Sequence, residues 1–166
     1  MDWRLQGDLL ALDGLRLRLH RIGLSHWRAG TNLRSWAVAP LHRDDDALYV
    51  PCAPGEALWL GAWLDEETAT RASVHLARAA PPAEAGLAVP QAFQLTGLWD
   101  GQGKAHPLTC AGDASVAALP LRLQCAADHA SIALILQAPE AWAMRAGRPP
   151  PPTLAGPPPL PPRLGS

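Results

Sequence analysis

Apolar and polar residues alternate with a period of two along much of the chain. The clearest case is residues 15–22, where Leu15, Leu17 and Leu19 alternate with arginine and histidine. The dipeptide Asp13-Gly14 separates this run from an apolar segment at residues 9–12, and Asp-Gly between two apolar runs is a strong hairpin signal. The sequence therefore predicts a β-hairpin over residues 9–22, with the three leucines facing a core.

Seven further segments have the length and composition of strands. Turn residues such as Pro54-Gly55 and Asp100-Gly101 separate them, and no long helical pattern intervenes. Many short strands at similar spacing predict an all-β fold, an antiparallel β-sandwich or jelly-roll-like domain. The expected strands are residues 35–39, 47–52, 57–64, 71–77, 92–99, 116–125 and 131–137.

Two segments carry helical signals. Residues 65–80 begin with three acidic residues and end before Pro81-Pro82, as a helix would, but they also alternate in a strand-like way. We expect a strand there, with the helix as the alternative. A second short helix is expected near residues 139–144, with Pro139 at its first position.

The end of the chain differs in composition from the rest. Residues 149–162 contain nine of the 18 prolines, so this segment cannot form a regular hydrogen-bonded ladder and favours an extended path. We expect one folded domain over residues 1–148 and a proline-rich tail, extended or disordered, over residues 149–166. Residues 158–163 match P-x-x-P-x-R, in which Arg163 would meet an acidic pocket of a partner.

Tryptophan dominates the aromatic content, with seven Trp against one Tyr and one Phe. If residues 57–64 form a strand, Trp59, Gly61 and Trp63 share one face while leucines fill the other. Both faces are then apolar. Such a strand either lies centrally with something packed over each side, or presents a Trp-Gly-Trp platform to a partner.

Charge and hydropathy exclude several classes of function. The net charge of −1 provides no overall attraction to phosphate backbones or anionic lipids, so we expect neither nucleic-acid nor membrane binding. No apolar run reaches the roughly 20 residues of a transmembrane helix, and no secretory signal is evident at the N-terminus. Three widely spaced cysteines suggest free thiols, and we expect a cytoplasmic protein.

The chain lacks the usual catalytic motifs. It contains no G-x-S-x-G elbow, phosphate-binding loop or dinucleotide-binding loop. No two histidines have the spacing of metal ligands on one element, and the acidic run Asp44-Asp45-Asp46 lacks the features of a calcium loop. His106 with Cys110 is the one conceivable base and thiol pair. We therefore expect no catalytic residues, no cofactor and no metal.

These observations favour a non-catalytic interaction or assembly module. It would bind a protein partner, or a second copy of itself, through Trp59, Gly61 and Trp63, with Arg163 as a second contact. One alternative is a carbohydrate-binding module that stacks sugars on Trp59 and Trp63. The other is a metal-dependent barrel enzyme that uses some of His20, His42, His75, His106 and His129.

Overall fold

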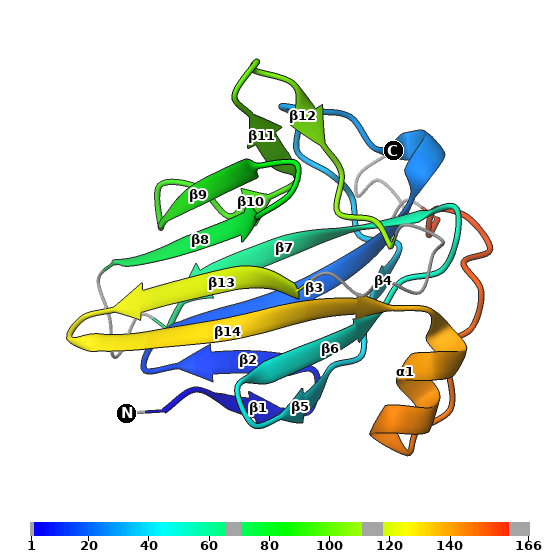
Figure 1. Ribbon diagram of the computed structural model, residues 1–166, viewed down its shortest axis with the longest axis horizontal. Helices are drawn as coiled ribbons and strands as arrows, with labels where there is room; N and C mark the ends of the chain where they lie inside the picture. The colour runs from blue at the N-terminus through cyan, green and yellow to red at the C-terminus, as the bar shows by residue number, and fades with distance from the viewer. Residues whose placement is uncertain (1, 66–70, 111–117, 160–166) are drawn as a thin grey trace, which may run out of the picture.

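A computed structural model describes residues 2–65, 71–110 and 118–159. They form two β-sheets, one short helix and a 3-10 turn, so the expected all-β class is confirmed (Figure 1). The six-stranded sheet has the order β1-β2-β3-β7-β10, with β4 paired to β3. Its strands are β1 (Arg4–Gln6), β2 (Leu9–Leu12), β3 (Leu15–Gly23), β4 (Ala37–Val38), β7 (Glu56–Leu64) and β10 (Gln94–Leu95).

The second sheet has eight strands in the order β12-β11-β9-β8-β13-β14-β6-β5. Within the described chain its pairs are antiparallel except for β14 with β6, which is parallel. The expectation of a purely antiparallel arrangement was wrong at this pair. The strands are β5 (His42–Asp44), β6 (Ala47–Pro51), β8 (Ala72–Arg78), β9 (Ala83–Val89), β11 (Leu98–Asp100), β12 (Ala105–His106), β13 (Ala118–Cys125) and β14 (Asp128–Gln137).

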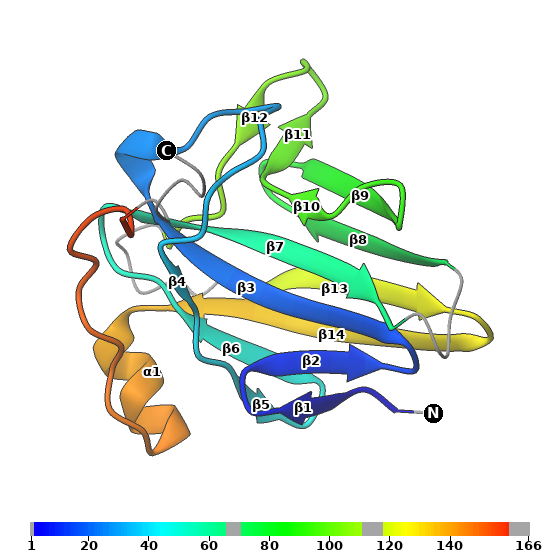
Figure 2. The same cartoon turned by 180° about the vertical axis from the view of Figure 1, so that it is seen from behind.

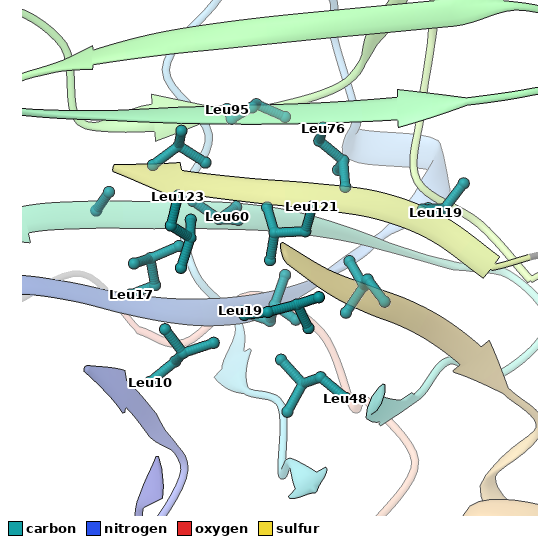
Figure 3. Packing of buried hydrophobic residues seen from close by; sticks show 14 of the residues in the cluster. Leu10, Leu17, Leu19, Leu48, Leu60, Leu76, Leu95, Leu119, Leu121 and Leu123 are labelled. Atoms are coloured by element: carbon teal, nitrogen blue, oxygen red, sulfur yellow. The ribbon is translucent and has the colours of Figure 1, made fainter. Parts of the chain in front are cut away.

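One hydrophobic core lies between the two sheets. Leu17 and Leu19 from β3 and Leu60 from β7 belong to the same buried cluster as Leu76 from β8 and Leu121 from β13 (Figure 3). Both sheets therefore donate alternate residues to the same interior, which accounts for the period of two in the sequence. The eight-stranded sheet is nearer the viewer in Figure 1 and the six-stranded sheet in Figure 2.

The hairpin β2–β3 is confirmed in register and in its turn. Leu12 pairs with Leu15, and Asp13 has a φ of 49°, which aspartate tolerates better than most residues. Leu15, Leu17 and Leu19 are buried as expected. Residues 72–78 form strand β8, so the strand expectation for this part of 65–80 is also confirmed, while residues 66–70 lie outside the described chain.

Two expectations about strands were wrong. Residues 92–99 do not form one strand, because the chain passes from β10 in one sheet to β11 in the other around Gly97. A Cβ on Gly97 would lie 2.7 Å from the carbonyl oxygen of His106, so glycine allows this close crossing. Strand β9 was not expected at all, because Ala83–Val89 lies between prolines and contains few residues that favour strands.

The helix expected near residue 139 is α1 (Pro139–Ala146), which begins with proline and ends at Gly147 with a φ of 66°. Its Trp142 is fully buried and donates a hydrogen bond from Nε1 to the Tyr49 carbonyl at 3.0 Å. This contact attaches the helix to β6. Residues 149–159 then run along the side of the domain without a helix or strand (Figures 1 and 2).

Candidate functional site

The tryptophans of β7 point away from the core. Leu58, Leu60 and Ala62 are buried between the sheets, so Trp59, Gly61 and Trp63 occupy the outer face of the six-stranded sheet. Strand β7 lies centrally in that sheet, between β3 and β10. Across the β3 ladder, the three outer residues of β7 pair in order with His20, Arg18 and Arg16.

The half of this outer face around Trp59 is covered. Residues 24–36, which include the 3-10 turn η1 (Leu24–His26), pass over it and place Leu33 in a small second core with Trp59. Gln94 fixes this segment, because its side-chain amide accepts from Leu33 N at 2.7 Å and donates to Leu33 O at 2.9 Å. Trp27 anchors it again by donating to the carbonyl of Thr96 at 2.8 Å. Trp59 is consequently only 6% exposed.

His20 occupies the space above Gly61. Its ring stacks on Trp59 with centroids 4.0 Å apart and planes within 15°, and its Nε2 would lie 3.1 Å from a Cβ built on Gly61. Nδ1 makes a 2.8 Å hydrogen bond with Ser35 Oγ. Burial, with a smaller effect of the nearby Arg18 charge, lowers the pKa of His20 to about 4. A neutral imidazole therefore fills the gap that a stacked flat ligand would need.

Among the described residues, the other half of the outer face is more open than the half around Trp59. Trp63 is half-buried, and the guanidinium of the exposed Arg18 lies 5.4 Å from the centre of its ring, a cation–π contact. Ala62 N donates to the carbonyl of Phe93 at 2.9 Å, which places Phe93 next to this end of β7. Phe93 is 60% exposed. The sequence did not single out Phe93, because it lies in the segment 92–99 that was expected to form one strand.

Arg163 lies outside the described residues. The described part of the tail contacts the domain through its backbone carbonyls: Arg21 Nη2 donates to Pro152 O at 2.9 Å, and Arg34 Nη2 donates to Pro159 O at 3.0 Å. Both acceptors are carbonyls of prolines, residues that lack the backbone N–H group needed for a regular hydrogen-bonded ladder. The tail therefore follows the domain surface up to residue 159.

The histidines that a metal site would need are dispersed. His20 lies on the outer face of the six-stranded sheet, His42 near Tyr49, and His129 on an exposed position of β14. His75 contacts Glu84, and His106 contacts Asp100 at 2.8 Å in the β11–β12 hairpin. Among residues 2–65, 71–110 and 118–159, no three His, Cys, Asp or Glu side chains are grouped as metal ligands.

Cys52 and Cys110 do not have the environment of a nucleophile. His106 is engaged with Asp100, while Cys110 Sγ lies 3.8 Å from the carbonyl of Leu136. Burial raises the pKa of Cys52 to about 11 and also raises the pKa of Cys110. Fewer thiolates form at neutral pH as a result, and the thiolate is the reactive form.

No family model, curated protein or solved structure matches the chain. None of the described helices is long and apolar enough to cross a bilayer.

Proposed function

We propose that the protein is a non-catalytic interaction module that binds a protein partner through the more open half of the six-stranded sheet. The contact surface consists of Trp63 and Arg18, with Phe93 at its edge beside the end of β7. The observation that carries the proposal is the guanidinium of the exposed Arg18, 5.4 Å from the ring centre of the half-buried Trp63; the 60% exposed Phe93 follows in the chain segment next to this end of β7. Exposed aromatic side chains with an arginine close by are typical anchors of protein interfaces.

The rest of the domain would serve as the scaffold that holds this surface in place. The two sheets with a common core fit a β-sandwich, in which β7 is held on both edges and packed on its inner face. Trp59 lies on the same face but is covered by residues 24–36, so it does not contact the partner. The tail and Arg163 would provide a second contact, and cytoplasmic residence is part of the proposal.

The carbohydrate alternative on Trp59, Gly61 and Trp63 has less support. A stacking platform needs two accessible rings and a gap between them, whereas Trp59 is covered and His20 lies over Gly61. The metal-dependent alternative likewise finds no grouped ligands in the described chain. We propose neither of them at this site.

Quantitative affinity purification of the full chain tests the proposal. We expect the variants Trp63→Ala and Phe93→Ala each to lose a partner, or self-association, that the wild-type chain retains. The matched control is Met144→Ala, because Met144 is 87% exposed but lies on α1. Unchanged partners and sedimentation in both aromatic variants, with folding verified by circular dichroism, would reject this surface.

A further inference from the structure

Cys52 and Cys110 lie at the same end of the two-sheet core, although they are far apart in the chain. The backbone N–H of Cys52, just after β6, donates to the carbonyl of Gln137 at the end of β14, at 2.8 Å. Cys110 Sγ lies 3.8 Å from the carbonyl of Leu136, the preceding residue of β14. Cys52 belongs to the main buried cluster, and Cys110 packs against it. Both cysteines therefore contact the same end of β14.

The backbone of β7 brings the two cysteines closer together. Leu58 and Leu108 form an antiparallel bridge, in which Leu58 N donates to Leu108 O at 2.9 Å. Two residues further along each segment, Glu56 comes opposite Cys110 on the inner side, because side chains alternate along paired segments. Cys52 Sγ donates to the carbonyl of Glu56 at 3.7 Å. Cys52 therefore contacts the residue that faces Cys110.

The ionisation of Cys52 responds directly to Cys110. Burial raises the pKa of Cys52 to about 11. The backbone N–H of Cys110 points at the Cys52 sulfur and opposes this rise, whereas a thiolate on Cys110 would increase it further by charge repulsion. A hydrogen bond from this N–H places the Cys52 sulfur next to the backbone atoms from which the Cys110 side chain extends.

We propose that Cys52 and Cys110 form a reversible disulfide when the protein meets an oxidant. A disulfide joins cysteines whose Cα atoms lie within about 7 Å, as residues on adjacent segments do. Cys125 is out of reach, because it pairs with Asp128 at the other end of β14, and this strand is about 30 Å long. The proposal does not depend on the surface around Trp63.

A low-molecular-weight disulfide, glutathione disulfide, is the oxidant of the proposed reaction. Cys110 is half-buried whereas Cys52 is 1% exposed, so the Cys110 thiolate attacks one sulfur of glutathione disulfide. This step forms a mixed disulfide on Cys110 and releases one glutathione thiolate. The Cys52 thiolate then attacks the Cys110 sulfur and releases the second one. Two protein thiols are oxidised, one glutathione disulfide is reduced to two thiols, and the two protons pass from the protein to glutathione.

The bond would fasten the segment after β12 to the end of β6. It would close a loop from residue 52 to residue 110 and so restrict the unfolded chain. The oxidised protein should therefore melt about 5 °C or more above the reduced protein. In a reducing compartment the thiols would persist, so the bond would form only under oxidising conditions.

Equilibration of the full chain with defined ratios of reduced to oxidised glutathione, followed by acid quenching and mass spectrometry, tests the proposal. The reaction is run at pH 8.5, because the raised pKa of both thiols makes exchange slow at neutral pH. We expect wild type to lose two of its three thiols together, with a peptide that links Cys52 to Cys110. The matched control Cys125→Ala should form the same bond. Cys52→Ser should instead accumulate the mixed disulfide on Cys110.

Two results at the most oxidising ratio would overturn the proposal, with folding verified by circular dichroism. One is a wild-type chain that keeps its three thiols or carries only glutathione adducts. The other is a disulfide that includes Cys125 or joins two chains. A rise in melting temperature on oxidation of Cys110→Ser as large as that of wild type would also contradict it. If Cys52→Ser does not fold, Cys110→Ser and the peptide map of wild type still decide the question.

Discussion

Replacing Glu56 by Gln removes the negative partner of a buried arginine. The Arg21 and Glu56 side chains, on neighbouring strands β3 and β7, are only 3% and 6% exposed. Arg21 Nη2 donates to Glu56 Oε1 at 2.7 Å, and Arg21 Nε donates to Oε2 at 3.3 Å. The Pro152 carbonyl accepts a further bond from Nη2 at 2.9 Å. Glu56→Gln would leave the guanidinium buried with neutral acceptors alone.

The expected loss of stability is large. At a charge separation of about 4 Å and an effective dielectric constant of about 20, the two charges attract by about 4 kcal/mol. Measured costs of removing one member of a buried pair are about 3–5 kcal/mol, because the other charge stays desolvated. A domain of this kind unfolds with a free energy of about 5–15 kcal/mol. The variant Glu56→Gln should therefore lose a substantial part of its free energy of unfolding.

Urea denaturation followed by tryptophan fluorescence measures the free energy of unfolding. The matched control is Asp44→Asn, which breaks the Arg145–Asp44 pair at 3.7 Å, whose side chains are 40% and 62% exposed. Exposed pairs contribute at most about 1 kcal/mol, so this variant should unfold nearly like wild type.

Two results would refute the reasoning about Glu56. One is a Glu56→Gln variant within about 0.5 kcal/mol of wild type, the range of ordinary surface substitutions. The other comes from the double variant Arg21→Met with Glu56→Leu. It leaves no buried charge and should be more stable than Glu56→Gln alone. If the double variant is less stable, the unpaired charge is not the cause of the loss.

Two further predictions concern His20 and Gly97. The pKa of His20 is about 4 in the folded protein and about 6.5 in the unfolded chain, so unfolding takes up a proton between these pH values. The free energy of unfolding should therefore fall as the pH decreases from about 6.5 to 4. This fall should be smaller in the variant His20→Phe. NMR titration of His20 with a midpoint near 6.5 would contradict this. Gly97→Ala should cost about 1–3 kcal/mol by overpacking against the His106 carbonyl, whereas Gly101→Ala, with no atom within 4 Å, should cost less in the same denaturation assay.

Much of the fold could be predicted from short stretches of sequence. The alternation over residues 15–22 and the Asp13-Gly14 turn determine the β2–β3 hairpin, because strand pleating and turn geometry depend on adjacent residues. Pro139 and Gly147 likewise mark the ends of α1. Strand β9 could not be predicted, because its weak local preference is outweighed by pairing with β8 along its whole length.

The candidate site was predicted only in part. The division of β7 into two apolar faces follows from its sequence and is confirmed by the burial of Leu58 and Leu60. The period of two cannot tell which outer residue stays accessible. Trp59 and Trp63 have equivalent positions in the pattern, yet one is covered and the other is half-buried.

By itself, the sequence determined the all-β class, the main hairpin and the apolar character of both faces of β7. Tertiary structure alone decided that Gln94 holds Leu33 near Trp59 and that the tail reaches Arg21. It also placed Trp99 of β11 beside Glu84 of β9, and Glu84 beside Ala77 of β8. The reason is that periodicity and turns are local properties of the backbone, whereas exposure depends on which distant segments pack over a residue.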